Sequence, residues 1–130
     1  MTHGELTERI EALANRAETA PTEMAAAILE DAWELIAPLW NLSSVALAQK
    51  AALFAGYMDA RAFLDAAMTL VPADCWHEIK GPRKYLNIPS PAPNYWSAHL
   101  AKWNHEGDVM GWAATPALAL CAAALRARNT

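Results

Sequence analysis

Residues Ala113 to Arg128 read Ala-Ala-Thr-Pro-Ala-Leu-Ala-Leu-Cys-Ala-Ala-Ala-Leu-Arg-Ala-Arg, and this order predicts a helix with both ends marked. Thr115 suits the N-cap because its hydroxyl can accept from an unpaired amide, and Pro116 suits the first helical position. Arg126 and Arg128 lie in the last turn, where cations favour the negative end of the helix dipole. Residues at helical spacing predict one buried stripe: Leu118, Cys121, Ala122 and Leu125. We therefore expect this helix to cover the core, with its alanines letting another layer approach closely.

The composition is that of one globular domain. The chain has 130 residues, enough for a single core. Its hydrophobic fraction is 55% and its charged fraction is 18%, which excludes the disordered class. The net charge of -4 is uneven, because residues 1–34 are strongly acidic and the remainder is slightly basic. The acidic start argues against a general nucleic-acid-binding protein, which would carry a basic stripe.

The cysteines and the apolar pattern indicate the compartment. Cys75 and Cys121 are too few for a disulfide framework, and no signal-peptide pattern precedes them. No apolar run reaches the roughly 18 residues of a membrane span. We expect a cytoplasmic protein with no membrane segment, whose two thiols are buried packing groups.

The N-terminal half has helical spacing. Thr2 and Glu5 match a capping box, which predicts a helix over about residues 4–18. A second helix follows Pro21. It is expected to end at Pro38, because the residue before a proline resists the α conformation.

Two further helices are predicted before the sheet. Ser43 or Ser44 can cap a third helix. Gly56 could end that helix or lie inside one long helix, at a cost of about 1 kcal/mol relative to alanine. We favour a break, with Asp59 capping a fourth helix that stops at Pro72.

After Pro72 the spacing of the sequence pattern changes, and residues alternate in character at every second position. Residues 75–80 alternate, which predicts a short strand closed by Gly81 and Pro82. Residues 81–93 contain four prolines and are expected to form an extended connection.

Alternation resumes over residues 95–103, and a turn at 104–108 leads into a third strand over 109–112. Helices could cover both faces of so small a sheet, as an α/β/α sandwich, or share one face, as a two-layer α+β domain. We predict an α+β fold that is α/β/α sandwich-like, forming one domain. Its helical N-terminal extension would span residues 1–58 and its core residues 59–128.

Two stretches resemble a known family. They are residues 63–72, which read Phe-Leu-Asp-Ala-Ala-Met-Thr-Leu-Val-Pro, and the Thr-Pro-Ala-Leu-Ala-Leu helix that begins at Thr115. Together they resemble the phage ABA sandwich domain of small phage and prophage proteins, over about residues 60–128. The resemblance implies a sandwich-like fold and a phage origin, hence a host bacterial cytoplasm. The matching residues are ones that pack in a core, so they indicate the fold and the origin better than an activity. The proline-rich connection and the helices before Asp59 depart from the family.

Histidines and cysteines raise the question of a metal site. Cys75 and His77 share a strand face, with His99 or His105 as further ligands. The spacing, however, is not one of the established zinc patterns. We therefore expect no metal and no other cofactor.

Catalytic patterns are equally weak. Ser97 and His99 share a strand face, but no nucleophile elbow or oriented acid accompanies them. We expect a protein that is not an enzyme. The enzymatic alternative is a nucleotide hydrolase with His99 as its general base.

Aromatic and basic residues gather near the second strand. Trp96 and Trp103 are seven residues apart, so they lie on opposite faces of a regular strand, and one aromatic face could meet a ligand or another subunit. Cations beside aromatic rings suit a phosphorylated planar ligand. The candidate ligand-binding residues are Arg83, Lys84, Tyr85, Tyr95, Trp96, His99 and Lys102. The alternative is that these residues form the solvent-exposed rim of a loop and bind no ligand.

These observations lead to two functional hypotheses. The first is a small phage or prophage accessory protein that counters a host defence without catalysis, by binding a host defence protein or sequestering a signalling nucleotide. The alternative is a structural or assembly protein that acts through self-association as a homo-oligomer.

Overall fold

The computed structural model describes residues 1–83, 95–103 and 107–129, with the backbone alone at Arg83. Over these ranges the chain has the predicted α+β fold, with a helical N-terminal half and a three-stranded antiparallel sheet. The α-helices are α1 (His3–Thr19), α2 (Ala25–Ile36), α3 (Ser44–Asp59), α4 (Phe63–Met68) and α5 (Pro116–Arg128). Short 3-10 helices lie at η1 (Thr22–Met24) and η2 (Ala37–Leu39). The strands are, in spatial order, β1 (Cys75–Arg83), β2 (Tyr95–Lys102) and β3 (Val109–Ala113).

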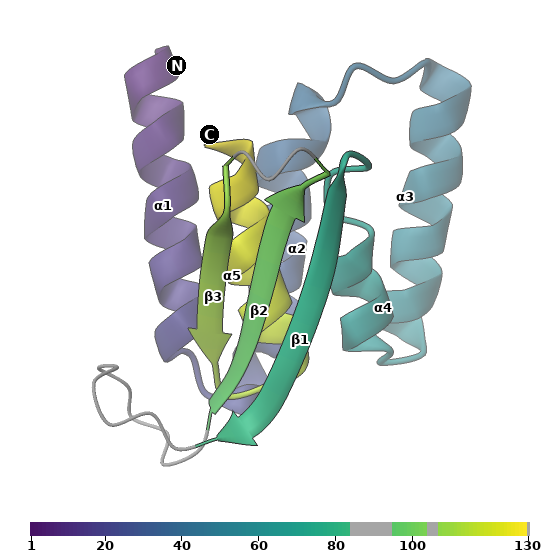
Figure 1. The fold of residues 1–130 in the computed structure, drawn as a ribbon. Coiled ribbons are helices and arrows are strands. Elements are labelled where there is room, and N and C mark those ends of the chain that lie inside the picture. The colour runs from purple at the N-terminus through teal and green to yellow at the C-terminus, as the bar shows by residue number, and fades with distance from the viewer. Residues whose placement is uncertain (84–94, 104–106, 130) are drawn as a thin grey trace.

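The helices gather on one side of the sheet. In Figure 1, α5 and α2 lie behind the strands, α1 runs along the β3 side, and α3 and α4 lie on the β1 side. None of the described helices lies in front of the sheet in this view. Of the two arrangements left open by the sequence, this is the one in which helices share one face. The same hydrophobic cluster includes side chains of α1, α2, α5 and the sheet.

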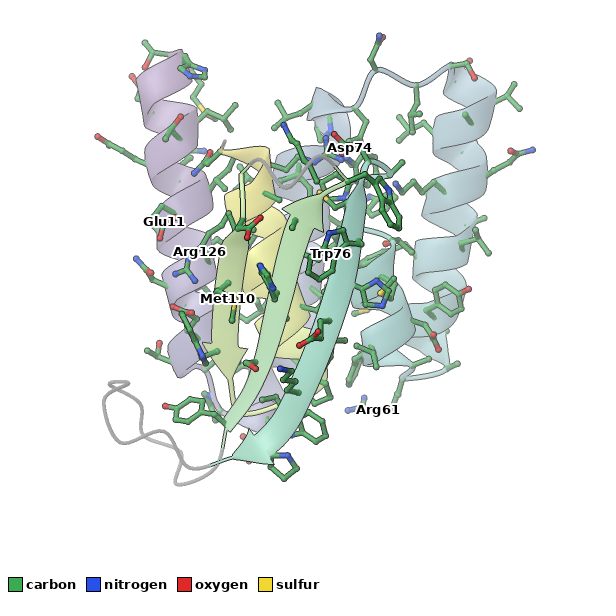
Figure 2. All side chains as sticks on the ribbon, in the orientation of Figure 1. Glu11, Arg61, Asp74, Trp76, Met110 and Arg126 are labelled. Atoms are coloured by element: carbon green, nitrogen blue, oxygen red, sulfur yellow. The ribbon has the colours of Figure 1, made fainter. Side chains whose placement is uncertain are left out.

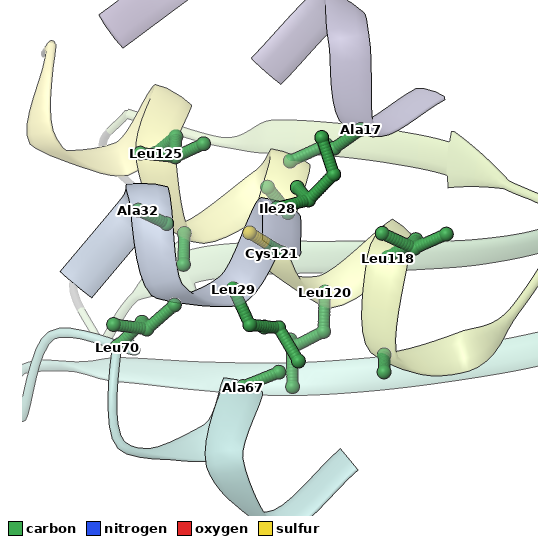
Figure 3. Packing of buried hydrophobic residues seen from close by; sticks show 14 of the residues in the cluster. Ala17, Ile28, Leu29, Ala32, Ala67, Leu70, Leu118, Leu120, Cys121 and Leu125 are labelled. Atoms are coloured by element: carbon green, nitrogen blue, oxygen red, sulfur yellow. The ribbon is translucent and has the colours of Figure 1, made fainter. Parts of the chain in front are cut away.

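Helix α5 lies at the centre of the core. Its predicted cap is confirmed, since the Thr115 hydroxyl accepts from the Leu118 N–H at 3.1 Å. The prediction of a single buried stripe is too narrow. Every residue from Ala117 to Leu125 is buried, so the helix is covered on all sides. Figure 3 shows Cys121 beside Ile28 of α2. A helix that is apolar all round needs neighbours on every side, so α5 is the centre of the core and not its cover.

Helix α5 and strand β3 approach each other very closely at Gly111. A Cβ atom placed on Gly111 would lie 2.8 Å from the Ala123 nitrogen and 3.0 Å from the Ala122 Cβ, and closer still to the Ala119 carbonyl oxygen. The helix backbone therefore rests directly on the strand. Only glycine on the strand and alanines on the helix permit this approach.

Arg126 joins the end of α5 to α1 and β3. Its two terminal nitrogens donate to the two carboxylate oxygens of Glu18, at 2.7 and 2.8 Å. It also donates to Glu11 Oε1 at 3.1 Å and to the Met110 carbonyl oxygen at 3.0 Å (Figure 2). The Glu18 carboxylate in turn accepts the Trp112 N–H at 3.1 Å. The hydrogen bonds and negative charges of Glu18 and Glu11 raise the pKa of Arg126, against the opposing effect of burial.

Three other helix ends agree with expectation, namely the starts of α1 and α3 and the end of α2. The Thr2 hydroxyl accepts from the Glu5 N–H at 3.1 Å at the start of α1, and the Ser43 hydroxyl accepts from the Ala46 N–H at 3.1 Å at the start of α3. Helix α2 stops at Ile36, shortly before the proline expected to end it. Within the described ranges, no helix combines the length and apolar character needed to cross a bilayer.

The predicted break at Gly56 is wrong. Helix α3 continues through this residue, and the Ala60 N–H still donates to the Gly56 carbonyl oxygen at 3.0 Å. The neighbouring alanines, leucine and methionine are strong helix formers, which outweigh one glycine. The chain reverses instead at Arg61, whose φ of 56° is left-handed, and Ala62 in place of Asp59 precedes α4.

The first strand is longer than predicted. Gly81 and Pro82 do not close it, since β1 continues to Arg83, which pairs with Tyr95 across an irregular register after Lys80. Gly81 has a φ of 146°, and a Cβ there would lie 2.8 Å from the Tyr95 carbonyl oxygen. A glycine in this conformation lets the strand bend and continue. Of the connection expected over 81–93, residues 84–93 lie outside the described residues.

Replacing Gly111 with alanine is expected to lower the free energy of unfolding by about 2 kcal/mol or more, because the new methyl group meets helix backbone that cannot yield locally. Urea unfolding measures this change. Gly56→Ala is the matched control: nothing lies within 4 Å of its added Cβ, so it should stabilise the protein by about 0.5–1 kcal/mol. Equal effects of the two substitutions would contradict the close contact of α5 with β3.

Arg126→Met is expected to destabilise the fold by about 2 kcal/mol, because it removes several charge-assisted hydrogen bonds and leaves Glu18 without its cation. Thermal or urea unfolding would show it. Arg16→Met serves as the control, since the Arg16–Asp31 pair is exposed and 3.4 Å long, and should change stability by about 0.5 kcal/mol or less. If both variants unfold like the wild type, the Arg126 network does not hold α1 on α5.

Candidate functional site

For three of the residues predicted to bind a ligand, the structure does not describe the side chain. Lys84 and Tyr85 lie outside the described residues, and Arg83 is described by its backbone, which pairs with Tyr95. Tyr95 itself is buried, with 2% of its surface exposed. Its ring is therefore part of the interior and offers little surface to a ligand.

The other three predicted residues are divided between the two faces of the sheet. Trp96 faces the helices and packs against the core. His99 lies on the opposite face, edge-on to Trp76 at 5.0 Å between ring centroids, with its Nε2 3.4 Å from Asp108 Oδ2. The structure thus separates Trp96 from His99. Lys102, at the end of β2, lies on the Trp96 face and borders a cleft beside α5.

A different set of residues combines an aromatic ring with positive charge. We call Trp40, Lys50 and Arg128 the Trp40 cluster. The Lys50 Nζ lies 3.9 Å from the centroid of the Trp40 ring, and the Arg128 Cζ lies 5.7 Å from it. The three residues come from the end of η2, from α3 and from the last turn of α5. Tertiary packing therefore assembles the cluster from distant parts of the chain.

Aromatic contacts fix the position of the Trp40 ring. Trp40 meets Trp33 of α2 edge-on, with centroids 5.0 Å apart. Trp33 stacks on Phe54 of α3 at 4.6 Å and an interplanar angle of 19°. Such pairs add stability beyond their buried area and restrict ring rotation. The cations of the cluster thus face a pre-positioned indole.

Two N–H donors of the cluster are buried without an acceptor. Both Trp40 Nε1 and Arg128 Nε are inaccessible to solvent and have no hydrogen-bond partner among the described residues. An unsatisfied buried donor costs roughly 1–3 kcal/mol. An acceptor atom that reached either donor would recover part of that energy, so the cluster favours a ligand with exposed oxygen atoms.

The two cations of the cluster repel each other. Burial lowers the pKa of Lys50, and the Arg128 guanidinium lowers it further. Burial also lowers the pKa of Arg128, which the nearby Asp74 carboxylate partly opposes. A negative charge bound beside both cations would relieve the repulsion and raise the pKa of Lys50. The electrostatics of the cluster therefore favour an anion.

A cleft of about 310 Å³ gives access to the cluster. Its walls include Trp40, Lys50 and Arg128, together with Leu42 and Asp74. Figure 2 places Asp74 near the start of β1. The indole and Leu42 offer apolar surface, and the cations offer charge. This composition can hold a small planar molecule that carries an anionic group.

Two other clefts of the described residues lack such unmet donors. The groove of about 410 Å³ between α1 and α2 contains Arg16, which already pairs with Asp31 at 3.4 Å. A second cleft of about 410 Å³ contains Arg61, whose guanidinium lies 5.1 Å from the Phe63 ring centroid. Among the described side chains, no group of three or more His, Cys, Asp or Glu residues could hold a metal ion. The Trp40 cluster is therefore the best-supported candidate.

Sequence reasoning missed this cluster. From the sequence, Arg128 is interpreted as a favourable charge at the end of a helix, and neither Trp40 nor Lys50 is singled out. One signal was present, since Lys50 and Asp59 are the only charged residues in the sequence of α3. A single cation within an otherwise uncharged stretch indicates a specific environment. Its partners, however, lie ten and 78 positions away, and no local pattern relates them.

Comparisons of the chain with protein-family models, with curated proteins and with solved structures each found no significant match.

Proposed function

We propose that this chain is a non-enzymatic binding protein whose ligand is a small phosphorylated molecule with a planar base, held at the Trp40 cluster. The observation that carries the proposal is that two donors of the cluster, Trp40 Nε1 and Arg128 Nε, are both buried without an acceptor among the described residues. Phosphoryl oxygens are strong acceptors, and a base can stack beside an indole.

The proposed biological role is that of a phage or prophage accessory protein in a bacterial host. This part rests on the resemblance of residues 60–128 to the phage ABA sandwich domain. In that setting a nucleotide used as a defence signal would be the ligand, and the protein would act by sequestering it. Binding without turnover is sufficient for this role, because a sequestered signal cannot reach its receptor.

Adenosine monophosphate is a suitable probe of the site. In two-dimensional ¹H–¹⁵N NMR spectra, its addition should shift the Nε1–H signal of Trp40 and the Nε–H signal of Arg128, because both donors gain an acceptor. Arg128→Met should weaken binding by about tenfold or more, the usual effect of losing a charge-assisted hydrogen bond.

Lys80→Met is the control for that experiment. Lys80 lies on β1 in an exposed pair with Glu78, at 2.8 Å, and its loss should leave binding unchanged. If adenosine monophosphate shifts neither donor signal in the wild type, the proposed function is wrong. If Lys80→Met and Arg128→Met weaken adenosine monophosphate binding equally, the nucleotide is attracted by the net charge of the protein and not by a specific site.

The titration of Lys50 provides a second prediction. Its pKa should lie below the ordinary lysine value of 10.5, and Arg128→Met should raise it only in part, because burial is the larger cause. Between the lowered pKa and 10.5 the unfolded chain holds a proton that the folded chain has lost. The stability of the wild type relative to Lys50→Met should therefore rise with pH across that window.

Carbon-13 NMR of the lysine side chains measures the pKa, and urea unfolding at several pH values measures the stability. Saturating adenosine monophosphate should move the pKa of Lys50 upward. An ordinary lysine pKa that does not respond to Arg128→Met would contradict the assigned contact between the two cations.

A further inference from the structure

Arg128 forms a wall common to two clefts. The larger cleft, of about 310 Å³, contains Trp40 and Lys50. The smaller cleft, of about 190 Å³, contains Lys102 and Cys75. Arg128 lines both clefts, and its guanidinium carries several N–H donors that can serve a ligand spanning them.

The smaller cleft has a cation of its own. Lys102 ends β2 and pairs in register with Cys75 at the start of β1. Burial and the adjacent Asp74 raise the pKa of the Cys75 thiol, and Lys102 and Arg128 partly oppose this rise. Lys102 and Arg128 both line the smaller cleft together with this thiol, so positive charge continues from the first cleft into the second.

The positive charge of the combined clefts is only partly balanced. Among the described residues, none of Lys50, Lys102 and Arg128 forms an ion pair within 4.0 Å. The acidic residue shared by the two walls is Asp74, whose Oδ1 accepts from the Cys75 thiol at 3.8 Å. Three cations facing one carboxylate favour a ligand with two negative groups.

From this arrangement, and resting on the proposed function, we infer that the ligand is a nucleoside diphosphate or a similar diphosphate ester. One phosphoryl group lies between Lys50 and Arg128 beside Trp40, and the adjacent one lies between Arg128 and Lys102. Because the two clefts share Arg128 and Asp74 in their walls, we expect the two anionic groups to be neighbours in the ligand. Lys102 is then a specificity-determining residue that distinguishes diphosphates from monophosphates.

The test compares adenosine diphosphate with adenosine monophosphate by calorimetry and by the Trp40 and Arg128 side-chain NMR signals, without added metal. The wild type should bind the diphosphate about tenfold more tightly. Lys102→Met should reduce diphosphate affinity to the monophosphate level while leaving monophosphate affinity unchanged. Arg128→Met should weaken both, and the exposed Lys80→Met should weaken neither.

Asp74→Asn tests the charge balance of the two clefts. The substitution removes a negative charge and preserves shape, so it should tighten binding of the diphosphate. Weaker binding of the diphosphate would show that Asp74 stabilises the bound ligand instead of repelling it, and would overturn the inference. Circular dichroism of each variant checks that the fold is retained.

Failure of the inference and failure of the proposed function give different results. If neither nucleotide shifts the Trp40 and Arg128 signals, the proposed function itself is wrong. If both nucleotides bind with equal affinity, or if Lys102→Met weakens both equally, the site binds one phosphoryl group and the diphosphate inference alone is overturned.

Discussion

The direct contact between the backbone of α5 and Gly111 of β3 is the constraint on which the rest of the structure depends. Because a side chain at this position would overlap the helix backbone, the sheet and the central helix must be made of small residues where they meet. Alanines on α5 satisfy this condition on the sheet side, and they also let α1, α2 and α4 approach from the other sides. A short sheet thereby gains a densely packed core in a chain of 130 residues.

A helix buried on every side concentrates its polar groups at its end. In α5 these groups are Arg126 and Arg128, which lie two residues apart and therefore point in different directions. Arg126 is fully engaged by Glu18, Glu11 and the β3 backbone, and it has a structural role. Arg128 lies against Trp40 with a buried donor unused. The same helix end thus supplies one residue for stability and one for the candidate site.

The candidate site lies at a junction of elements that fold for other reasons. Trp40 is held by its contact with Trp33, which in turn stacks on Phe54 and joins α2 to α3. The packing that fixes α3 against the body therefore also fixes Lys50 over the indole. Pre-positioned groups lose little entropy on binding, which explains how so few residues could form a specific site.

The sequence alone determined the elements whose signals are local: the capped ends of α1, α3 and α5, the change to period two after Pro72, and the α+β class. It did not determine that α3 passes through Gly56, because helix propensity there competes with a weak local breaker. Nor did it separate Trp96 from His99 as ligand-binding residues, or unite Trp40, Lys50 and Arg128, because these depend on which surfaces meet. Tertiary packing decided the site, since charge, burial and missing acceptors arise only when distant segments come together.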